Sequence, residues 1–367
     1  MMTTADAPGV DLSDLATDDP ARLDRAAAAI AHGYGHFGLV SVSGHGLDPV
    51  EVDAFYADFV AVTERSEAEK ARFHRADIWY QRGWTPPNTE GAVVAQGQKD
   101  FKECWFAAPL PGDPEAVAFF PELFADNLFP EDLPSFRDRY LDLGRQLHEV
   151  GERLLAGAER ALGLDPGTFA DLTRGGAHLT RALRYLSVPP EDLDRHVLWG
   201  EEHTDFNLLT ILAGGRFFNP QGEPADRPDD RSGLYLRTRP TSDHPRGQMV
   251  PGRAPKGHIV SQVGQQLEIL TGGTFLATPH VIKAPRATGW TRTSLAHFVH
   301  VHPLRTLAPL PPLRTPEAIA AYRPPALAGT YAIKTLVDIK LAPASALDRL
   351  GYRHYGRLAD IRAAGEW

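Results

Sequence analysis

The feature that most constrains the fold of this chain is a change in hydrophobic periodicity near residue 178. Before it, apolar residues recur at helical spacing, which predicts helices over 19–34, 48–73 and 133–162, the last one ended by Gly163. After it, short apolar runs alternate with loops rich in Gly, Pro and Asp, which is typical of strands. Strands are expected at 101–107, 179–187, 206–213, 233–238, 258–263, 267–271, 275–282 and 293–301, and a final helix over 330–350.

The pattern predicts a mainly β protein with flanking helices. Many short strands punctuated by turns favour a sandwich, barrel or jelly roll. We expect a helical or mixed N-terminal region over 1–177, a β core over 178–305 with an exposed insertion at 219–256, and a C-terminal helical extension over 306–367. The 33 Gly and 31 Pro among 367 residues fit such a turn-rich body.

Composition restricts the classes of partner and of metal site. The single cysteine, Cys104, excludes a disulfide framework and a cysteine zinc site, so any metal must be bound by His, Asp or Glu. A net charge of −9 gives no support to nucleic-acid binding, which selects a basic surface. The start has no secretory pattern and no run of 18 apolar residues occurs, so neither a membrane partner nor export is expected, and a cytoplasmic protein is the default.

The most informative stretch contains His203 and Asp205, two positions apart at the mouth of a predicted strand. Side chains at i and i+2 of a strand share a face, so this imidazole and carboxylate can form two corners of a metal site. A third ligand could be His280 or one of three later histidines: His297, His300 and His302. Two His and one carboxylate are the ligand set of non-haem Fe(II) oxygenases, although zinc tolerates the same ligands.

Several motifs then follow one another in a recognisable order. They are Gly35–Gly46, with the sequence GHFGLVSVSGHG; Gly83–Pro86 followed by Phe101–Glu103; His203-Thr204-Asp205; Gly264–Gly273, with the sequence GQQLEILTGG; His280; and Arg292-Thr293-Ser294. In this order they resemble the isopenicillin N synthase-like branch of the 2-oxoglutarate/Fe(II)-dependent dioxygenases, over roughly residues 8–305. Gln265 stands where that family usually has Asp, and the family's Tyr near the co-substrate has no clean equivalent around Arg184–Ser187.

The resemblance implies a double-stranded β-helix (jelly roll) core and an Fe(II) site formed by His203, Asp205 and His280, which would be the catalytic centre. It also implies that Arg292 and Ser294 bind 2-oxoglutarate, which is consumed with O₂ to give succinate and CO₂ while a small-molecule substrate is oxidised. The residues support the carboxylate role independently. Arg292 and Ser294 share a strand face, and a guanidinium beside a hydroxyl suits a carboxylate.

Seven further residues are predicted to face the substrate. They are Arg82, Trp84, Lys102, Arg184, Tyr185, Asn207 and Phe298. If Arg82 or Arg184 points inward, the substrate is an anion such as an amino acid or another carboxylate.

Three functions remain open from the sequence. The first is a 2-oxoglutarate-dependent oxygenase that hydroxylates, desaturates or cyclises a small molecule. The second is an Fe(II) oxidase or cyclase of the same fold that does not use 2-oxoglutarate. The third is a non-catalytic jelly-roll binding protein. The substrate and the oligomeric state do not follow from the sequence.

Overall fold

The large sheet forms the centre of the molecule. A computed structural model describes residues 8–90, 101–195, 198–240, 242–348 and 350. Ten strands belong to this mostly antiparallel sheet. In spatial order its main path is β1 (Gly9–Asp11), β2 (Leu39–Ser43), β12 (Ile259–Val263), β7 (Leu209–Leu212), β14 (Thr291–Val299), β5 (Leu179–Tyr185), β4 (Lys102–Ala107) and β3 (Gly83–Thr85). Two more strands extend from β14: β8 (Arg216–Phe218) and β9 (Pro224–Ala225).

A smaller sheet completes the core. Its strands, in order, are β11 (Met249–Pro251), β10 (Gly233–Arg237), β13 (His280–Lys283) and β6 (Leu198–His203). A separate pair joins β15 (Thr306–Leu307) to β16 (Ala326–Leu327). The predicted fold class, mainly β with flanking helices and a jelly-roll core, is confirmed; among the described strands the sheets do not close into a barrel.

Ten α-helices lie in the described part of the chain. They are α1 (Pro20–His32), α2 (Pro49–Thr63), α3 (Glu67–Lys70), α4 (Pro114–Phe119), α5 (Pro134–Leu162), α6 (Thr168–Thr173), α7 (Gln265–Leu270), α8 (Pro316–Ala321), α9 (Ala328–Asp338) and α10 (Ser345–Asp348). A π turn spans Gly33–Phe37, and 3₁₀ turns span Leu12–Leu15, Ala71–Phe73, Ala76–Ile78, Pro121–Phe124, Pro190–Arg195 and Pro311–Leu313. Within the described part of the chain, no helix has both the length and the apolar character needed to cross a bilayer.

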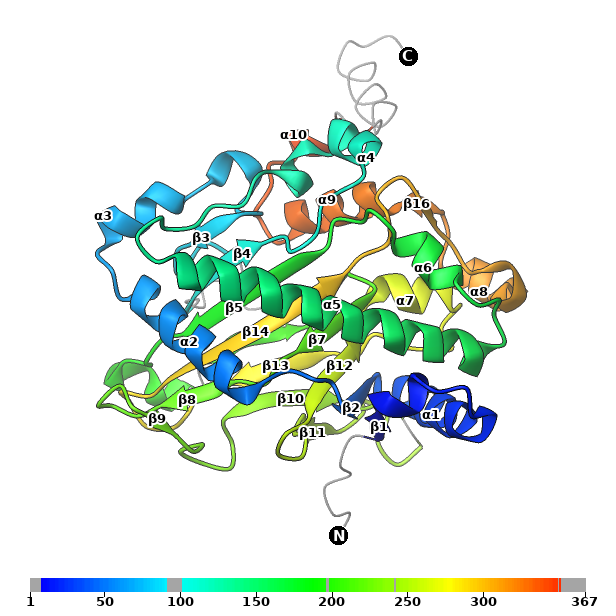
Figure 1. The fold of residues 1–367 in the computed structure, drawn as a ribbon, viewed down its shortest axis with the longest axis horizontal. Helices are drawn as coiled ribbons and strands as arrows, with labels where there is room; N and C mark the ends of the chain where they lie inside the picture. The colour runs from blue at the N-terminus through cyan, green and yellow to red at the C-terminus, as the bar shows by residue number, and fades with distance from the viewer. Residues whose placement is uncertain (1–7, 91–100, 196–197, 241, 349, 351–367) are drawn as a thin grey trace.

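Helix α5 lies across the large sheet, over β5, β14 and β7 (Figure 1). The buried side chains of α5 pack against the helix-facing side chains of these strands, and together they form part of the main hydrophobic core. The buried Tyr140 hydroxyl lies 2.7 Å from the Trp105 carbonyl and 2.9 Å from the Thr180 carbonyl, so it ties the helix to β4 and β5. Because strand residues alternate between faces, this packing leaves the other face of the sheet to line a cavity.

The register of the strands places the cavity-facing residues in rows. Lys102 on β4 pairs with Tyr185 on β5, which pairs with Arg292 on β14. Arg181 lies four residues before Tyr185 on β5. It pairs with Phe106 on β4 and with Ala296 on β14. The N-terminal strand β4 and the later strands β5 and β14 therefore contribute to one continuous wall.

Several predicted elements differ in detail from the structure. The helices at 19–34 and 133–162 are confirmed, and Gly163 ends α5 with a left-handed φ of 65°. The expected helix over 48–73 is interrupted because α2 ends at Thr63 and Ser66 caps the short α3. The helix expected over 330–350 is likewise divided into α9 and α10.

The strand predicted at 267–271 is wrong. Helix α7 occupies this stretch, with Leu267 and Leu270 buried at a spacing of three. A short apolar run does not distinguish a strand from a buried helical turn, so tertiary packing decided this element.

Gly151 marks a close approach of α5 to β14. A Cβ there would lie 2.8 Å from Cγ2 of Val299, a branched side chain held rigidly by its strand. We expect Gly151→Ala to lower the free energy of unfolding by about 1–3 kcal/mol through overpacking, against a gain of about 1 kcal/mol in helix propensity. Urea denaturation of both proteins measures the difference.

Gly157→Ala in the same helix is the matched control. Its Cβ would meet only the ends of the flexible Ile30 and Leu15 side chains, so a smaller loss is expected. A Gly151→Ala variant more stable than the wild type would show that α5 does not press against β14.

Candidate metal centre

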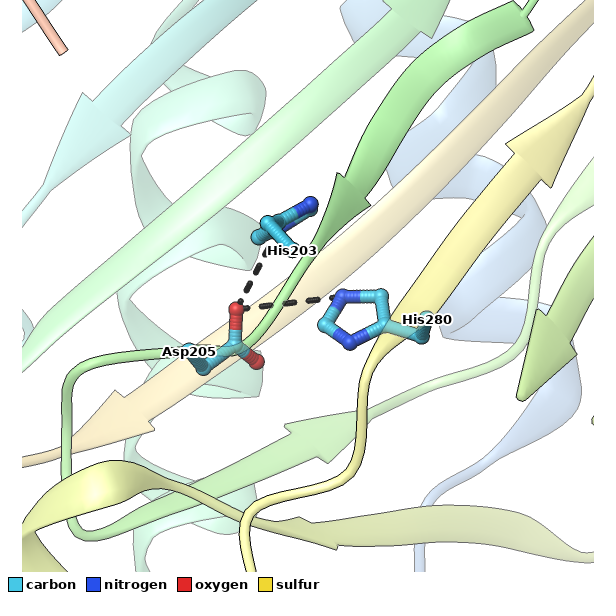
Figure 2. A group of neighbouring side chains, drawn as sticks. All are labelled: His203, Asp205 and His280. Atoms are coloured by element: carbon cyan, nitrogen blue, oxygen red, sulfur yellow. Dashed lines mark ion pairs between the residues drawn. The ribbon is translucent and has the colours of Figure 1, made fainter. Parts of the chain in front are cut away.

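Three side chains of types that bind metal ions meet at the end of the small sheet, where the chain passes to the large sheet. His203 ends β6, His280 begins β13, and the two residues are register partners with ring centroids 4.3 Å apart. Asp205 lies in the turn after β6, and its Oδ1 is 3.6 Å from His203 Nε2 and 3.8 Å from His280 Nε2 (Figure 2). One potential ligand atom from each residue lies within 4.8 Å of the others. The predicted triad is therefore assembled, although a turn and not strand alternation aims Asp205 inward.

Each ligand is oriented by a partner behind it. Nδ1 of His203 donates to the Glu201 carbonyl at 2.7 Å, and Nδ1 of His280 faces the Thr278 carbonyl at 3.3 Å. Both Nε2 atoms thus point toward Asp205. The Thr210 hydroxyl, from β7 in the other sheet, donates to Asp205 Oδ2 at 2.6 Å and leaves Oδ1 toward the imidazoles. Such partners fix the tautomer and direction of metal ligands.

The charges of the triad suit a divalent cation. Burial alone would raise the pKa of Asp205, but His280, His203 and Thr210 bring it below its ordinary value, so this group is a carboxylate. Burial and the neighbouring His203 lower the pKa of His280 to about 4, so His280 is a neutral imidazole. Burial opposes the charged form of His203, but Asp205 and the Glu201 carbonyl raise its pKa. A bound metal would take the place of the proton between the His203 imidazole and the Asp205 carboxylate.

Helix α7 holds the turn that carries the ligands. The backbone N–H of Gln265 donates to the Asp205 carbonyl at 2.8 Å, and Gly264 precedes it where a Cβ would come within 2.1 Å of the Asn207 carbonyl. The Gln265 side chain donates to Thr204 Oγ1 at 2.6 Å and accepts from the Tyr331 hydroxyl on α9. The glutamine that departs from the family's usual Asp thus bridges two groups in this chain.

Arg292 and Ser294 face the same cavity from β14, as their spacing predicts. The guanidinium lies between two rings, 5.3 Å from the centre of Tyr185 and 5.9 Å from that of Phe217. Its Nη1 is buried and has no hydrogen-bond partner among the described residues. A guanidinium with a buried, unused donor is suited to an anionic ligand.

The cavity has a volume of about 310 Å³ and both sheets contribute to its walls. Four of the residues predicted to face the substrate line it: Lys102, Tyr185, Asn207 and Phe298. Asn207 also donates to Thr210 Oγ1 at 3.0 Å, so it supports the Asp205 partner. Ala332, Thr335 and Leu336 of α9 line the cavity as well.

Three residues predicted to face the substrate lie outside the cavity lining. Arg82 is buried but donates to the carbonyls of Gln81 and Leu123. Trp84 is buried and donates to Glu103 at 2.8 Å. Arg184 faces α2, where it donates to Thr63 Oγ1 and Glu64 Oε1, both at 2.8 Å. Neighbouring residues of a strand point to opposite faces, so Arg184 points toward α2 whereas Tyr185 points into the cavity.

The rival histidines have other partners. His297 is fully buried under α5, with ring nitrogens 3.1 Å from His148 Nδ1 and 2.9 Å from Thr180 Oγ1. His302 Nε2 lies 3.6 Å from Asp113. His300 lines the cavity and contacts the Phe206 ring, but it is outside the three-residue group.

Three residues that matter at the site were missed from the sequence. Thr210 supports Asp205, while Glu90 and Arg181 line the cavity as an ion pair. Arg181 carries a readable signal, because it lies four positions before Tyr185 on one strand and so shares its face. Glu90 comes from a turn-rich loop, and no local pattern marks it.

Comparisons with known proteins agree with this geometry. A family model described as non-haem dioxygenase in morphine synthesis N-terminal matches residues 7–132. A "Probable iron/ascorbate oxidoreductase" of Dictyostelium discoideum is 26% identical over 285 residues, covering 72% of this chain and 72% of the relative. The 2-oxoglutarate-dependent ethylene/succinate-forming enzyme of Ralstonia nicotianae is 29% identical over 253 residues, covering 64% of this chain and 69% of the relative.

A solved structure supports the same assignment at the level of the fold. A full-length Neurospora crassa protein in complex with alpha-KG superposes with a TM-score of 0.73 at 19% identity, covering 91% of this chain and 98% of that one. The chain is similar to members of the 2-oxoglutarate/Fe(II)-dependent dioxygenase superfamily, a class of oxidoreductases. The resemblance predicted from the motif order is thereby confirmed at the level of the superfamily.

Thr210→Val tests the support of Asp205 without changing side-chain shape. Removing the hydroxyl leaves Asp205 Oδ2 without this donor, so affinity for a divalent metal should fall about 10- to 100-fold. Anaerobic titration with Fe(II), or with Co(II) as a coloured substitute, measures the change.

Thr293→Val is the matched control. Thr293 lies on the helix-covered face of β14, and its buried hydroxyl has no hydrogen-bond partner among the described residues. It should bind metal as the wild type does. Equal affinities in the two variants would show that Thr210 does not orient the ligand.

Proposed function

We propose that this chain is a non-haem Fe(II)- and 2-oxoglutarate-dependent oxygenase that hydroxylates, desaturates or cyclises a small molecule, with succinate and CO₂ as co-products. The observation that carries the proposal is that one cavity contains both the His203–Asp205–His280 triad and Arg292, whose Nη1 donor is unpaired among the described residues. The catalytic and metal-binding residues are then the triad, and the 2-oxoglutarate-binding residues are Arg292 and Ser294.

The donor set fits iron. Two imidazoles and one carboxylate on one side of a cation leave its other positions to exogenous ligands, which this superfamily's chemistry requires. Iron with 2-oxoglutarate and O₂ would supply an oxidative decarboxylation coupled to oxidation of a substrate C–H bond. The Arg292 guanidinium and the Ser294 hydroxyl would hold the distal carboxylate of 2-oxoglutarate, beside the hydroxyl-bearing ring of Tyr185.

The remaining walls select and shield the substrate. Leu183, Leu212, Ala296 and Phe298 provide an apolar lining that excludes water from the reacting atoms. A volume of about 310 Å³ is at the lower end for small-molecule sites, which typically measure about 300–1,000 Å³. The substrate is accordingly a small molecule. Because the cations Lys102 and Arg181 line the cavity, we infer that it carries a carboxylate, as in an amino acid. We also propose that residues 1–177, 178–305 and 306–367 form three structural parts and that the protein is cytoplasmic.

A second candidate function follows from Arg292 itself. The carboxylate that it binds can belong to the substrate, in which case the chain is an Fe(II)-dependent oxidase or cyclase that does not use 2-oxoglutarate. Consumption of 2-oxoglutarate during substrate turnover separates the two functions.

Alanine substitution of each ligand tests the metal site. His203→Ala, Asp205→Ala and His280→Ala should each abolish succinate release from 2-oxoglutarate, because each removes one of three protein ligands. His45→Ala is the control, since that half-buried imidazole lies outside the cavity lining and hydrogen-bonds to the Gly257 carbonyl and to the backbone N–H of Leu47. Full succinate release by any ligand variant would remove the assignment.

Arg292→Ala tests the co-substrate site. Loss of a charge-assisted contact should raise the apparent KM for 2-oxoglutarate about 10- to 100-fold while changing substrate affinity far less. Arg216→Ala provides the control, because Arg216 on the adjacent β8 pairs with Asp53 on α2. An unchanged KM for 2-oxoglutarate in Arg292→Ala would make Arg292 a structural residue.

A further inference from the structure

Three charged side chains form a cluster in the cavity wall, away from the metal ligands. Glu90 Oε2 lies 3.0 Å from the Lys102 ammonium, and Glu90 Oε1 accepts from the Arg181 guanidinium. The three side chains are 12–17% exposed and all line the cavity that contains the triad. Burial alone would raise the pKa of Glu90, but Arg181 and Lys102 lower it below its ordinary range, so all three groups are charged.

Arg181 has hydrogen-bonding capacity that the cluster does not use. Its buried Nε has no hydrogen-bond partner among the described residues. A buried donor of a charged group is costly to leave unpaired, so a ligand that accepts from it gains affinity. The second cation, Lys102, lies on the same carboxylate, which places two positive groups side by side in a largely apolar cavity.

The guanidinium is held in a fixed position. Its Nη2 donates to Cys104 Sγ at 3.1 Å as well as to Glu90, and its Cζ lies 4.9 Å from the centre of the Phe106 ring. A rigid guanidinium loses little freedom when it binds a ligand, which favours recognition of a planar carboxylate.

The cluster is distinct from the site of Arg292. Arg181 pairs with Ala296, four residues from Arg292 along β14, which corresponds to about 13 Å of strand. Lys102 lies in the row of Tyr185 and Arg292 but two strands away from Arg292, which corresponds to about 10 Å across the sheet. One cavity thus contains two separate cationic positions, and the co-substrate requires only one of them.

We propose that Lys102 and Arg181, held in place by Glu90, form a second anion-binding site that receives a carboxylate of the oxidised substrate. This inference rests on the proposed function, in which Arg292 holds 2-oxoglutarate. The substrate class is therefore a small carboxylic acid, oriented with its acid group toward β4 and β5.

Glu201 divides that class in two. It also lines the cavity, from β6 on the facing sheet, two residues before His203. An ammonium on the substrate would meet a carboxylate there, whereas a simple carboxylic acid would not use it. Amino acids and their deaminated counterparts are thus the two sources that the experiment must compare.

The test measures binding to the full-length protein loaded with Fe(II) and 2-oxoglutarate without O₂. The probes are the L-amino acids, the corresponding deaminated acids, and the primary amide of each compound. Thermal shift and the visible spectrum of the loaded site report binding, and succinate release after O₂ is admitted reports turnover. We expect acids to bind and their amides to bind at least tenfold more weakly.

Arg181→Met should weaken binding of those acids roughly 10- to 100-fold while leaving 2-oxoglutarate affinity unchanged. Arg184→Met is the matched control: it lies on the same strand but faces α2, so it should bind every probe as the wild type does. Lys102→Met should resemble Arg181→Met, which guards against a folding defect in a single variant.

Four results would overturn the proposal. They are equal binding of acids and amides, absence of binding by every acid, unchanged acid affinity in Arg181→Met, and loss of 2-oxoglutarate affinity in that variant. Failure of the proposed function is a different result: acids bind through Arg181, but O₂ produces no succinate.

Discussion

The packing of helix α5 against the outer face of the large sheet decides which side chains can reach the cavity. Tyr140 and Gly151 hold the helix close to β5 and β14, so alternate residues of these strands are committed to the helix-covered core. The intervening residues face inward, and they include Arg181, Tyr185, Arg292 and Ser294. The packing of one helix thus fixes the orientation of the polar lining on that wall.

Local spacing and motif order were enough to predict that the proposed metal triad and the Arg292–Ser294 pair lie in one cavity. The same alternation could have corrected the substrate residues, since Arg184 and Tyr185 are adjacent on one strand and cannot both face the cavity. Glu90 could not be found in this way. It meets Arg181 across 91 positions of sequence, and only the folded chain brings the two together.

The buried histidines show why counting ligand-type residues is insufficient. His297 shares hydrogen bonds with His148 and Thr180, and burial together with His148 and His300 brings its pKa well below the ordinary value. It is a neutral polar residue on the face of β14 covered by α5. The sequence gives His297 and His300 equal standing as ligands, and the face of the sheet on which each lies separates them.

The position of Asp205 between two sheets has a thermodynamic consequence. His203 and His280 belong to the small sheet, whereas Asp205 is hydrogen-bonded to Thr210 in the large one. A cation bound by all three would cross-link the two layers in the native state alone, so binding would add to folding stability. At a free metal concentration 100 times the dissociation constant, this linkage amounts to about 2.7 kcal/mol. Metal loading would then determine the equilibrium stability of the folded protein as well as its chemistry.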